Sequence, residues 1–150
     1  MGGMPAASQD IAGFVQCFAD GWRQPTPHAW DTILDEDVRL VQPLLANGRG
    51  LRLWHRQVTR LLQLAPDLHL DVLGWAAADD LVFIEFRATG TVGGHRLTWT
   101  GVDRFVLADG KAIERRSFFD PGPLAVQIAQ SGGSGPPDVG WSAPAGQRSR

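Results

Sequence analysis

Asp103 is the residue of this chain whose position most strongly suggests chemistry. It lies in residues 97–107, where apolar side chains occupy alternate positions, and a second run of this kind covers residues 112–119. Asp109-Gly110 separates the two runs, and Asp-Gly between alternating runs is a strong hairpin signal. The sequence therefore predicts two antiparallel strands, with Asp103 on the first of them.

Strand periodicity places Asp103 on an apolar surface. Successive strand side chains point to opposite faces, so Asp103 shares its face with Trp99, Gly101 and Phe105. A charged carboxylate is costly there unless it is paired or used. We predict that Asp103 is a general acid or base. The alternative is that Asp103 forms a buried ion pair with Arg115 on the adjacent strand. Arg115 could also neutralise the carboxylate of a ligand.

Four further polar residues could assist Asp103. His55 lies in the apolar stripe of a predicted helix, where it either shuttles a proton with Asp103 or is a core histidine bonded to backbone. Gln42 can donate its amide to a carbonyl oxygen, and Ser117 offers a weak hydrogen bond. Asp120 either faces the mouth of a pocket or starts a turn.

Aromatic side chains from several predicted elements could form the wall of a cavity. Such a wall would suit a flat or polycyclic apolar ligand, although each ring taken alone could simply fill the core. The residues concerned are Phe18, Trp22, Trp30, Trp54, Trp99 and Phe119.

Composition excludes several classes of function. A formal net charge of −2 with scattered signs gives no nucleic-acid footprint. The single cysteine rules out an internal disulfide and a cysteine-rich zinc site, and His28, His69 and His95 lack metal-ligand spacing, so we predict no metal and no cofactor. No apolar run approaches the roughly 20 residues that span a bilayer, and the first residues do not resemble a secretory signal. We expect a cytoplasmic protein without membrane partners.

Periodicity and turn signals predict an α+β domain. Helices are expected at residues 8–23, from Thr26-Pro27 to Leu34, and at 51–65; strands are expected at 38–42, 68–77, 81–92, 94–107 and 112–119. Three N-terminal helices would pack on one face of a strongly curved antiparallel sheet that encloses a cone-shaped cavity. Residues 1–7 are predicted to be a flexible N-terminus, 8–124 the domain, and 125–150 a helix end and a disordered Gly/Pro/Ser tail.

Three sequence segments resemble the nuclear transport factor 2-like superfamily, and its SnoaL-like polyketide cyclase branch most closely. They are Gly21-Trp22 at the end of the first helix, "ILDEDVRLVQP", and "GVDRFVLADGKAIERRSFFDP". The resemblance covers about residues 8–124 and implies the same cone-shaped fold. It also implies a homodimer formed through the outer sheet face, where Phe83 and Phe118 lie among polar residues.

Only some of the catalytic residues of the families that this chain resembles are present at the corresponding positions. Ketosteroid isomerase-like members have a tyrosine and an aspartate base at positions that correspond here to Phe18 and Gln42, and an aspartic acid at Asp103. SnoaL-like cyclases have an aspartate and a histidine at positions that correspond here to Ser117 and Asp103.

Epoxide hydrolase-like members have an arginine and two aspartates at positions that correspond here to Phe86, Ala88 and Asp120, so that one of the three is kept. Epoxide hydrolysis is the least favoured reading.

The sequence indicates a cofactor-independent cyclase or isomerase for an apolar polyketide-like or terpenoid-like carbonyl compound, with Asp103 and His55 as catalytic residues. The alternative is a protein that binds an apolar small molecule without catalysis.

Overall fold

The computed structural model describes residues 8–131. The predicted flexible N-terminus and the predicted tail from residue 132 onward lie outside this range. The elements are α1 (Ser8–Arg23), β1 (Leu34–Val41), β2 (Gly48–Arg49), α2 (Leu51–Leu64), β3 (His69–Ala78), β4 (Leu81–Val92), β5 (His95–Ala108), β6 (Lys111–Phe119) and α3 (Gly122–Gln130).

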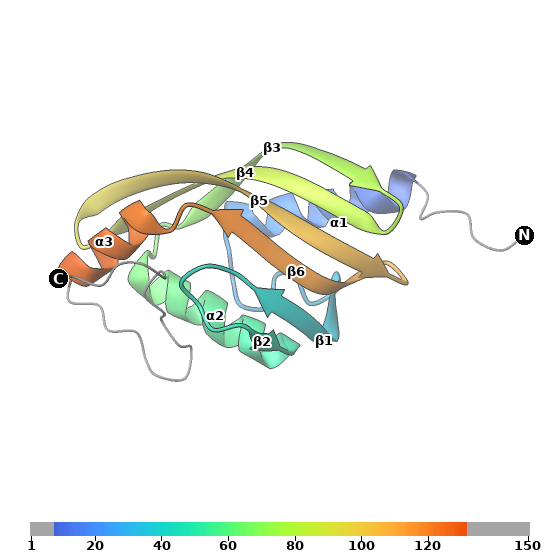
Figure 1. Ribbon diagram of the computed structural model, residues 1–150, viewed down its shortest axis with the longest axis horizontal. Helices are drawn as coiled ribbons and strands as arrows, with labels where there is room; N and C mark the ends of the chain where they lie inside the picture. The colour runs from blue at the N-terminus through green and yellow to red at the C-terminus, as the bar shows by residue number, and fades with distance from the viewer. Residues whose placement is uncertain (1–7, 132–150) are drawn as a thin grey trace, which may run out of the picture.

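A single curved sheet of six strands forms one layer of the described domain (Figure 1). Its strand order is β2-β1-β6-β5-β4-β3. The predicted α+β architecture is therefore present, but the sheet is mixed and not purely antiparallel, because β1 pairs in parallel with β6. This pairing sets Leu40 opposite Arg115.

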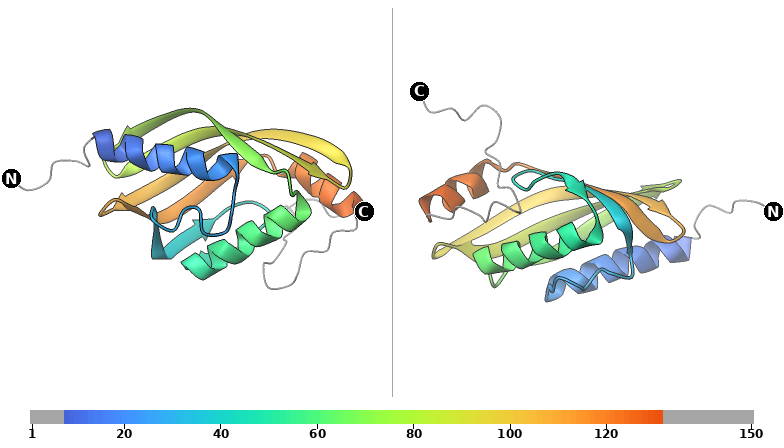
Figure 2. Two further views of the ribbon diagram at one scale, coloured as in Figure 1. Left: turned by 180° about the vertical axis from the view of Figure 1, so that it is seen from behind. Right: turned by 90° about the horizontal axis from the view of Figure 1, so that it is seen from below.

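Helices α1 and α2 lie on the same side of the curved sheet (Figure 2). Helix α1 buries an apolar face against the sheet, consisting of Ile11, Phe14, Val15, Phe18 and Trp22. Gly21 allows a close approach on this helix, because a Cβ atom there would collide with the Trp30 indole. The hydrophobic core lies between these helices and the sheet, and the burial of its apolar surface stabilises the fold.

The helix predicted from Thr26 is wrong, since residues 27–33 form hydrogen-bonded turns. Most of the hydrogen bonds there join residues three apart, as from the Ala29 amide to the Thr26 carbonyl, and the Leu34 amide closes a wider turn on Trp30. The Ile33 carbonyl accepts a hydrogen bond from the Ala112 amide of β6, and Leu34 pairs with Ala112, so strand pairing uses backbone that would have continued a helix. The segment enters β1 directly, four residues earlier than expected.

The hairpins follow the predicted turns. Strand β4 has the predicted bounds, and β3, β5 and β6 differ from the predicted ranges by one residue at most at each end. Asp109 and Gly110 have φ of 53° and 79°, the positive values that a tight two-residue hairpin turn requires.

The third helix lies at the C-terminal end of the described chain and not at the N-terminal end, as was predicted. Helix α3 begins at Gly122 and runs past the predicted boundary at residue 124. It packs beside the β4–β5 turn, because a Cβ on Gly93 would lie 2.8 Å from the Ser131 side chain. None of the helices in residues 8–131 is long and apolar enough to cross a membrane.

Candidate functional site

The candidate site is built on the inner face of β5 and β6. Their antiparallel register sets Asp103 opposite Ser117 and Phe105 opposite Arg115. Because alternate residues share a face, Asp103, Arg115 and Ser117 all project toward the helices. All three are buried.

Asp103 and Arg115 form a buried ion pair. The Arg115 Nε and Nη2 atoms lie 3.1 and 3.0 Å from Asp103 Oδ2. The Asp103 side chain is 0% exposed and that of Arg115 is 10% exposed. Within the described chain, Asp103 Oδ1 is buried without a hydrogen-bond partner. The structure therefore contains the pair that was the alternative to a catalytic Asp103.

Arg115 is held from two other directions. Its Nη1 atom donates to Gln42 Oε1 at 3.4 Å, and its guanidinium carbon lies 4.8 Å from the ring centre of Trp54. Gln42 in turn donates from Nε2 to the Ala46 carbonyl, which fixes the amide just beyond the end of β1. A guanidinium carries five N–H donors, and these contacts engage three of them. Donors are left for a ligand oxygen.

A cavity of about 70 Å³ adjoins Arg115. Its described lining is apolar apart from Arg115, Gln42 and Ser117 and the indole N–H groups. The lining residues are Trp22, Gln42, Pro43, Leu44, Leu45, Trp54, Leu61, Leu68, Leu70, Phe86, Ala88, Trp99, Arg115, Ser117, Phe119 and Leu124. The sequence reasoning missed the β1–β2 connection at 43–45 and Leu124 of α3, because neither belongs to a periodic run that points inward.

The predicted aromatic wall is divided between two spaces. Trp22, Trp54, Trp99 and Phe119 line the main cavity. Phe18 and Trp30 do not; together with Trp22 and Trp54 they line a void of about 10 Å³. The Trp30 indole lies 4.5 Å from that of Trp22 and 5.4 Å from that of Trp54, centre to centre, so these rings fill that end of the core.

Besides Phe18 and Trp30, three polar residues of the predicted site lie away from the main cavity. Asp103 is not among its lining residues and is reached only through its neighbours Arg115 and Ser117. Asp120 is exposed and accepts a hydrogen bond from the Gly122 amide, the turn-forming role that was its alternative. His55 is not brought to Asp103 and contacts Asp31 instead.

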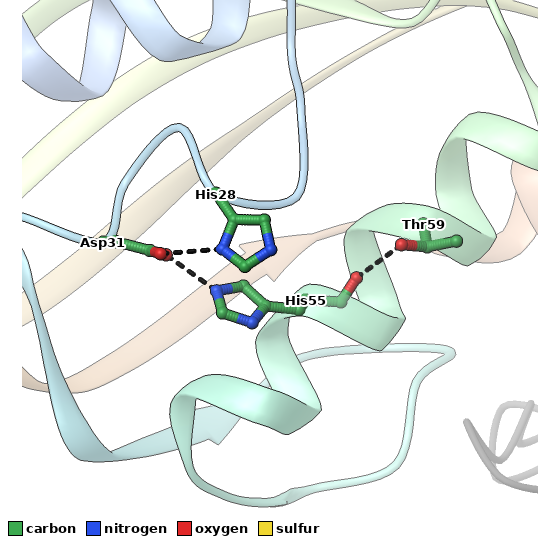
Figure 3. A network of polar contacts seen from close by, with 4 residues as sticks. All are labelled: His28, Asp31, His55 and Thr59. Atoms are coloured by element: carbon green, nitrogen blue, oxygen red, sulfur yellow. Dashed lines mark hydrogen bonds and ion pairs between the residues drawn. The ribbon is translucent and has the colours of Figure 1, made fainter.

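His28, Asp31 and His55 form a cluster that the sequence reasoning missed (Figure 3). His28 Nδ1 lies 2.8 Å from Asp31 Oδ2, and His55 Nε2 lies 2.7 Å from Asp31 Oδ1. Burial raises the pKa of Asp31, but hydrogen bonds and charges of the two imidazoles outweigh burial and hold that pKa below its ordinary value of 3.8. The signal in the sequence was His28-x-x-Asp31, which places both side chains on one turn.

The Arg115 guanidinium beside the apolar cavity can polarise the oxygen of a bound ligand. Arg115 remains charged at any physiological pH, so it cannot act as a base, but it can stabilise negative charge on a ligand oxygen. The carboxylate behind it offsets the cost of burying the cation. Ser117 lies directly opposite Asp103 on β6, but no hydrogen bond joins Ser117 to Asp103 Oδ1, which has no partner among the described residues.

The sequence model of the SnoaL-like domain family matches residues 14–115, which is more than half of the chain. A search of curated proteins finds no match.

Solved structures share the fold at low sequence identity. One, assigned to the SnoaL-like polyketide cyclases of Jannaschia sp. CCS1, is 24% identical over 91% of this chain and 99% of its own, with a TM-score of 0.70. TsrD from Streptomyces laurentii is 18% identical over 80% of this chain and 95% of its own, with a TM-score of 0.68. A protein with a ketosteroid isomerase-like fold from Catenulispora acidiphila DSM 44928, in complex with trimethylamine, is 20% identical over 79% and 92%, also with a TM-score of 0.68.

Proposed function

Because the chain belongs to the SnoaL-like domain family, we propose that it is a cofactor-independent cyclase or isomerase of an apolar, polyketide-like or terpenoid-like carbonyl compound. The observation that carries the proposal is the position of Arg115, a buried cation that borders an apolar cavity and is held by a carboxylate behind it. Such a group binds the oxygen of a carbonyl and stabilises the enolate formed when a neighbouring C–H bond is broken.

Asp103 is the proposed proton acceptor, working through Ser117. The step requires the Ser117 hydroxyl to turn toward Asp103 Oδ1, which has no hydrogen-bond partner among the described residues. The substrate C–H proton then passes to the Ser117 oxygen while the Ser117 hydroxyl proton passes to Asp103 Oδ1. The electron pair of the C–H bond moves into the enolate, whose oxygen accepts from Arg115. Return of the proton to another carbon gives an isomer, and attack of the enolate carbon on a second carbonyl gives a ring. His55 has no part in this step, because its ring nitrogen contacts Asp31.

The cavity limits the substrate. An apolar cavity of about 150 Å³ accommodates benzene, so about 70 Å³ is small for any ring system. A ring-sized substrate therefore requires displacement of the lining. Leu44 of the β1–β2 connection has φ of 73°, an unfavourable value for leucine, and this segment is the proposed part that moves.

The test is hydrogen exchange into a panel of mono- and bicyclic ketones dissolved in D₂O. The enzyme is expected to accelerate deuterium incorporation next to the carbonyl, detected by mass spectrometry, before any product is known. Asp103→Asn should lower the rate by about 10²-fold or more, as loss of a general base does, while the exposed Asp120→Asn is the matched control. Equal rates for wild type and Asp103→Asn between pH 5 and 9 would remove Asp103 from the mechanism.

Binding without catalysis is the second candidate, and the burial of Asp103 away from the cavity favours it. A binding protein would retain a ketone of the panel through gel filtration and return it without deuterium. Arg115→Met would weaken that retention, since the ligand oxygen would lose its donor. A ketone that is released with deuterium identifies the enzyme instead.

We also propose that the chain forms a homodimer through the outer face of the sheet. Phe83 and Phe118 are 38% and 50% exposed, which is high for large apolar residues. Sedimentation velocity at micromolar concentration should give the mass of a dimer for wild type and of a monomer for Phe118→Lys. A monomeric wild type would contradict the proposal.

A further inference from the structure

We propose that His28, Asp31 and His55 form a binding site for a divalent transition-metal ion, with Zn²⁺ as the preferred ion. The three side chains come from two parts of the chain. His28 and Asp31 lie on the turns before β1, and His55 lies on α2 (Figure 3). The site is separate from the Arg115 cavity and does not depend on the function proposed for it.

The donor atoms are already gathered. One nitrogen of each histidine and a carboxylate oxygen of Asp31 all lie within 4.8 Å of one another. Zinc–ligand bonds of about 2.0–2.1 Å at tetrahedral angles set the donor atoms about 3.3 Å apart. The histidine–aspartate contacts of 2.7 and 2.8 Å would open by several tenths of an ångström to admit the ion.

The type of ligand decides which ion is bound. Two imidazole nitrogens and one carboxylate oxygen suit Zn²⁺ and its neighbours among the first-row metals, whereas Mg²⁺ and Ca²⁺ require oxygen ligands. Asp31 supplies the anionic oxygen, and each of its two carboxylate oxygens already faces one imidazole nitrogen.

The site is open on one side. The His28 side chain is 72% exposed, while those of Asp31 and His55 are 35% and 20% exposed. An ion can therefore enter from solvent and keep one or more waters, the coordination pattern of zinc sites that exchange their fourth ligand. The two imidazole rings lie 4.0 Å apart, so that two of the ligands are already brought close together.

The turns before β1 and helix α2, which supply the three ligands, also carry two residues of the aromatic wall. Trp30 lies on the turns next to Asp31, and Trp54 precedes His55 on α2; their rings are 5.4 Å apart. An ion that joins Asp31 to His55 would fasten the turns to the helix at this point. Metal binding should therefore change tryptophan fluorescence and raise the unfolding temperature.

Calorimetric titration of the full chain with ZnCl₂ tests the proposal. We expect one Zn²⁺ per chain, and a dissociation constant at least about tenfold larger in His28→Ala, which removes one of three ligands. His28 is so exposed that its loss should leave the far-UV circular dichroism unchanged. His95→Ala removes an exposed histidine outside the cluster and is the matched control. Titration with CoCl₂ gives a second readout, since the visible absorption bands of Co²⁺ change with its ligands and coordination geometry.

Two results would overturn the proposal. One is the absence of any heat or absorption change up to about 100 µM metal, and the other is equal affinity in wild type and His28→Ala. Asp31→Asn and His55→Asn should each reproduce the loss in His28→Ala; either variant that folds suffices for this comparison.

Discussion

Breaking the Asp103–Arg115 pair should cost far more than replacing both of its members. The Asp103 side chain is fully buried, and Arg115 supplies both of the nitrogens that contact it. Arg115→Met leaves a buried carboxylate without a cation, and Asp103→Leu leaves a buried guanidinium held only by Gln42 and Trp54. We expect each single substitution to lower the free energy of unfolding by about 3–5 kcal/mol, with Arg115→Met near the lower value because water can enter the adjoining cavity.

The double substitution is the decisive variant. Asp103→Leu combined with Arg115→Met removes both charges and fills the space with apolar groups, which is often neutral in buried pairs. Its expected cost is about 0–2 kcal/mol, so the coupling energy between the two positions should be about 4 kcal/mol or more. Urea titration, followed by tryptophan fluorescence and by circular dichroism, gives the four free energies of the cycle.

A matched pair on the surface provides the control. Arg87 and Asp71 lie 3.8 Å apart with half-exposed side chains, so their coupling should stay below about 1 kcal/mol. Additive effects of the two single substitutions at Asp103 and Arg115 would refute the reasoning, since they would mean that neither charge depends on the other.

Two further predictions concern the helical and turn segments. Gly21→Ala should destabilise the protein by about 1–3 kcal/mol because its Cβ would collide with the buried Trp30 indole, whereas Gly13→Ala on the same helix meets no atom within 4 Å and should stabilise by about 0.5–1 kcal/mol; thermal unfolding of both variants compares them. Hydrogen bonds from the Thr91 hydroxyl and amide hold the pKa of Asp67 below 3.8, so this carboxylate stabilises the fold above pH 3.8, and the stabilisation disappears as pH falls through the lowered value. The stability difference between wild type and Asp67→Asn should accordingly be complete at pH 7 and should shrink as the pH falls below 3.8, and a difference that does not change with pH would contradict this.

The parts of the fold that were predictable depend on local signals. Strands β3 to β6 follow from period-two alternation and from turns such as Asp109-Gly110, whose backbone demands are met by a few neighbouring residues. The parallel pairing of β1 with β6 has no such local signal. The segment at 27–33 carries helix-like apolar spacing, but the pattern does not report that the chain pairs with β6 from Leu34 onward.

The candidate site was likewise predictable only where local sequence signals specify it. Strand parity gives the shared inner face of Asp103, Arg115 and Ser117, because it depends only on position within one hairpin. The partner of His55 could not be inferred, since it depends on where the turns before β1 lie relative to α2. A helical stripe defines a face of the helix and says nothing of what packs on it.

The contact between Gln42 and Arg115 joins residues that are 73 positions apart, across the parallel β1–β6 pairing. During synthesis the first third of the chain leaves the ribosome long before the strand that completes its sheet exists. Folding of this domain should therefore wait for nearly the whole chain, and a truncated product that ends before β6 would present β1 as an open edge able to pair with other chains.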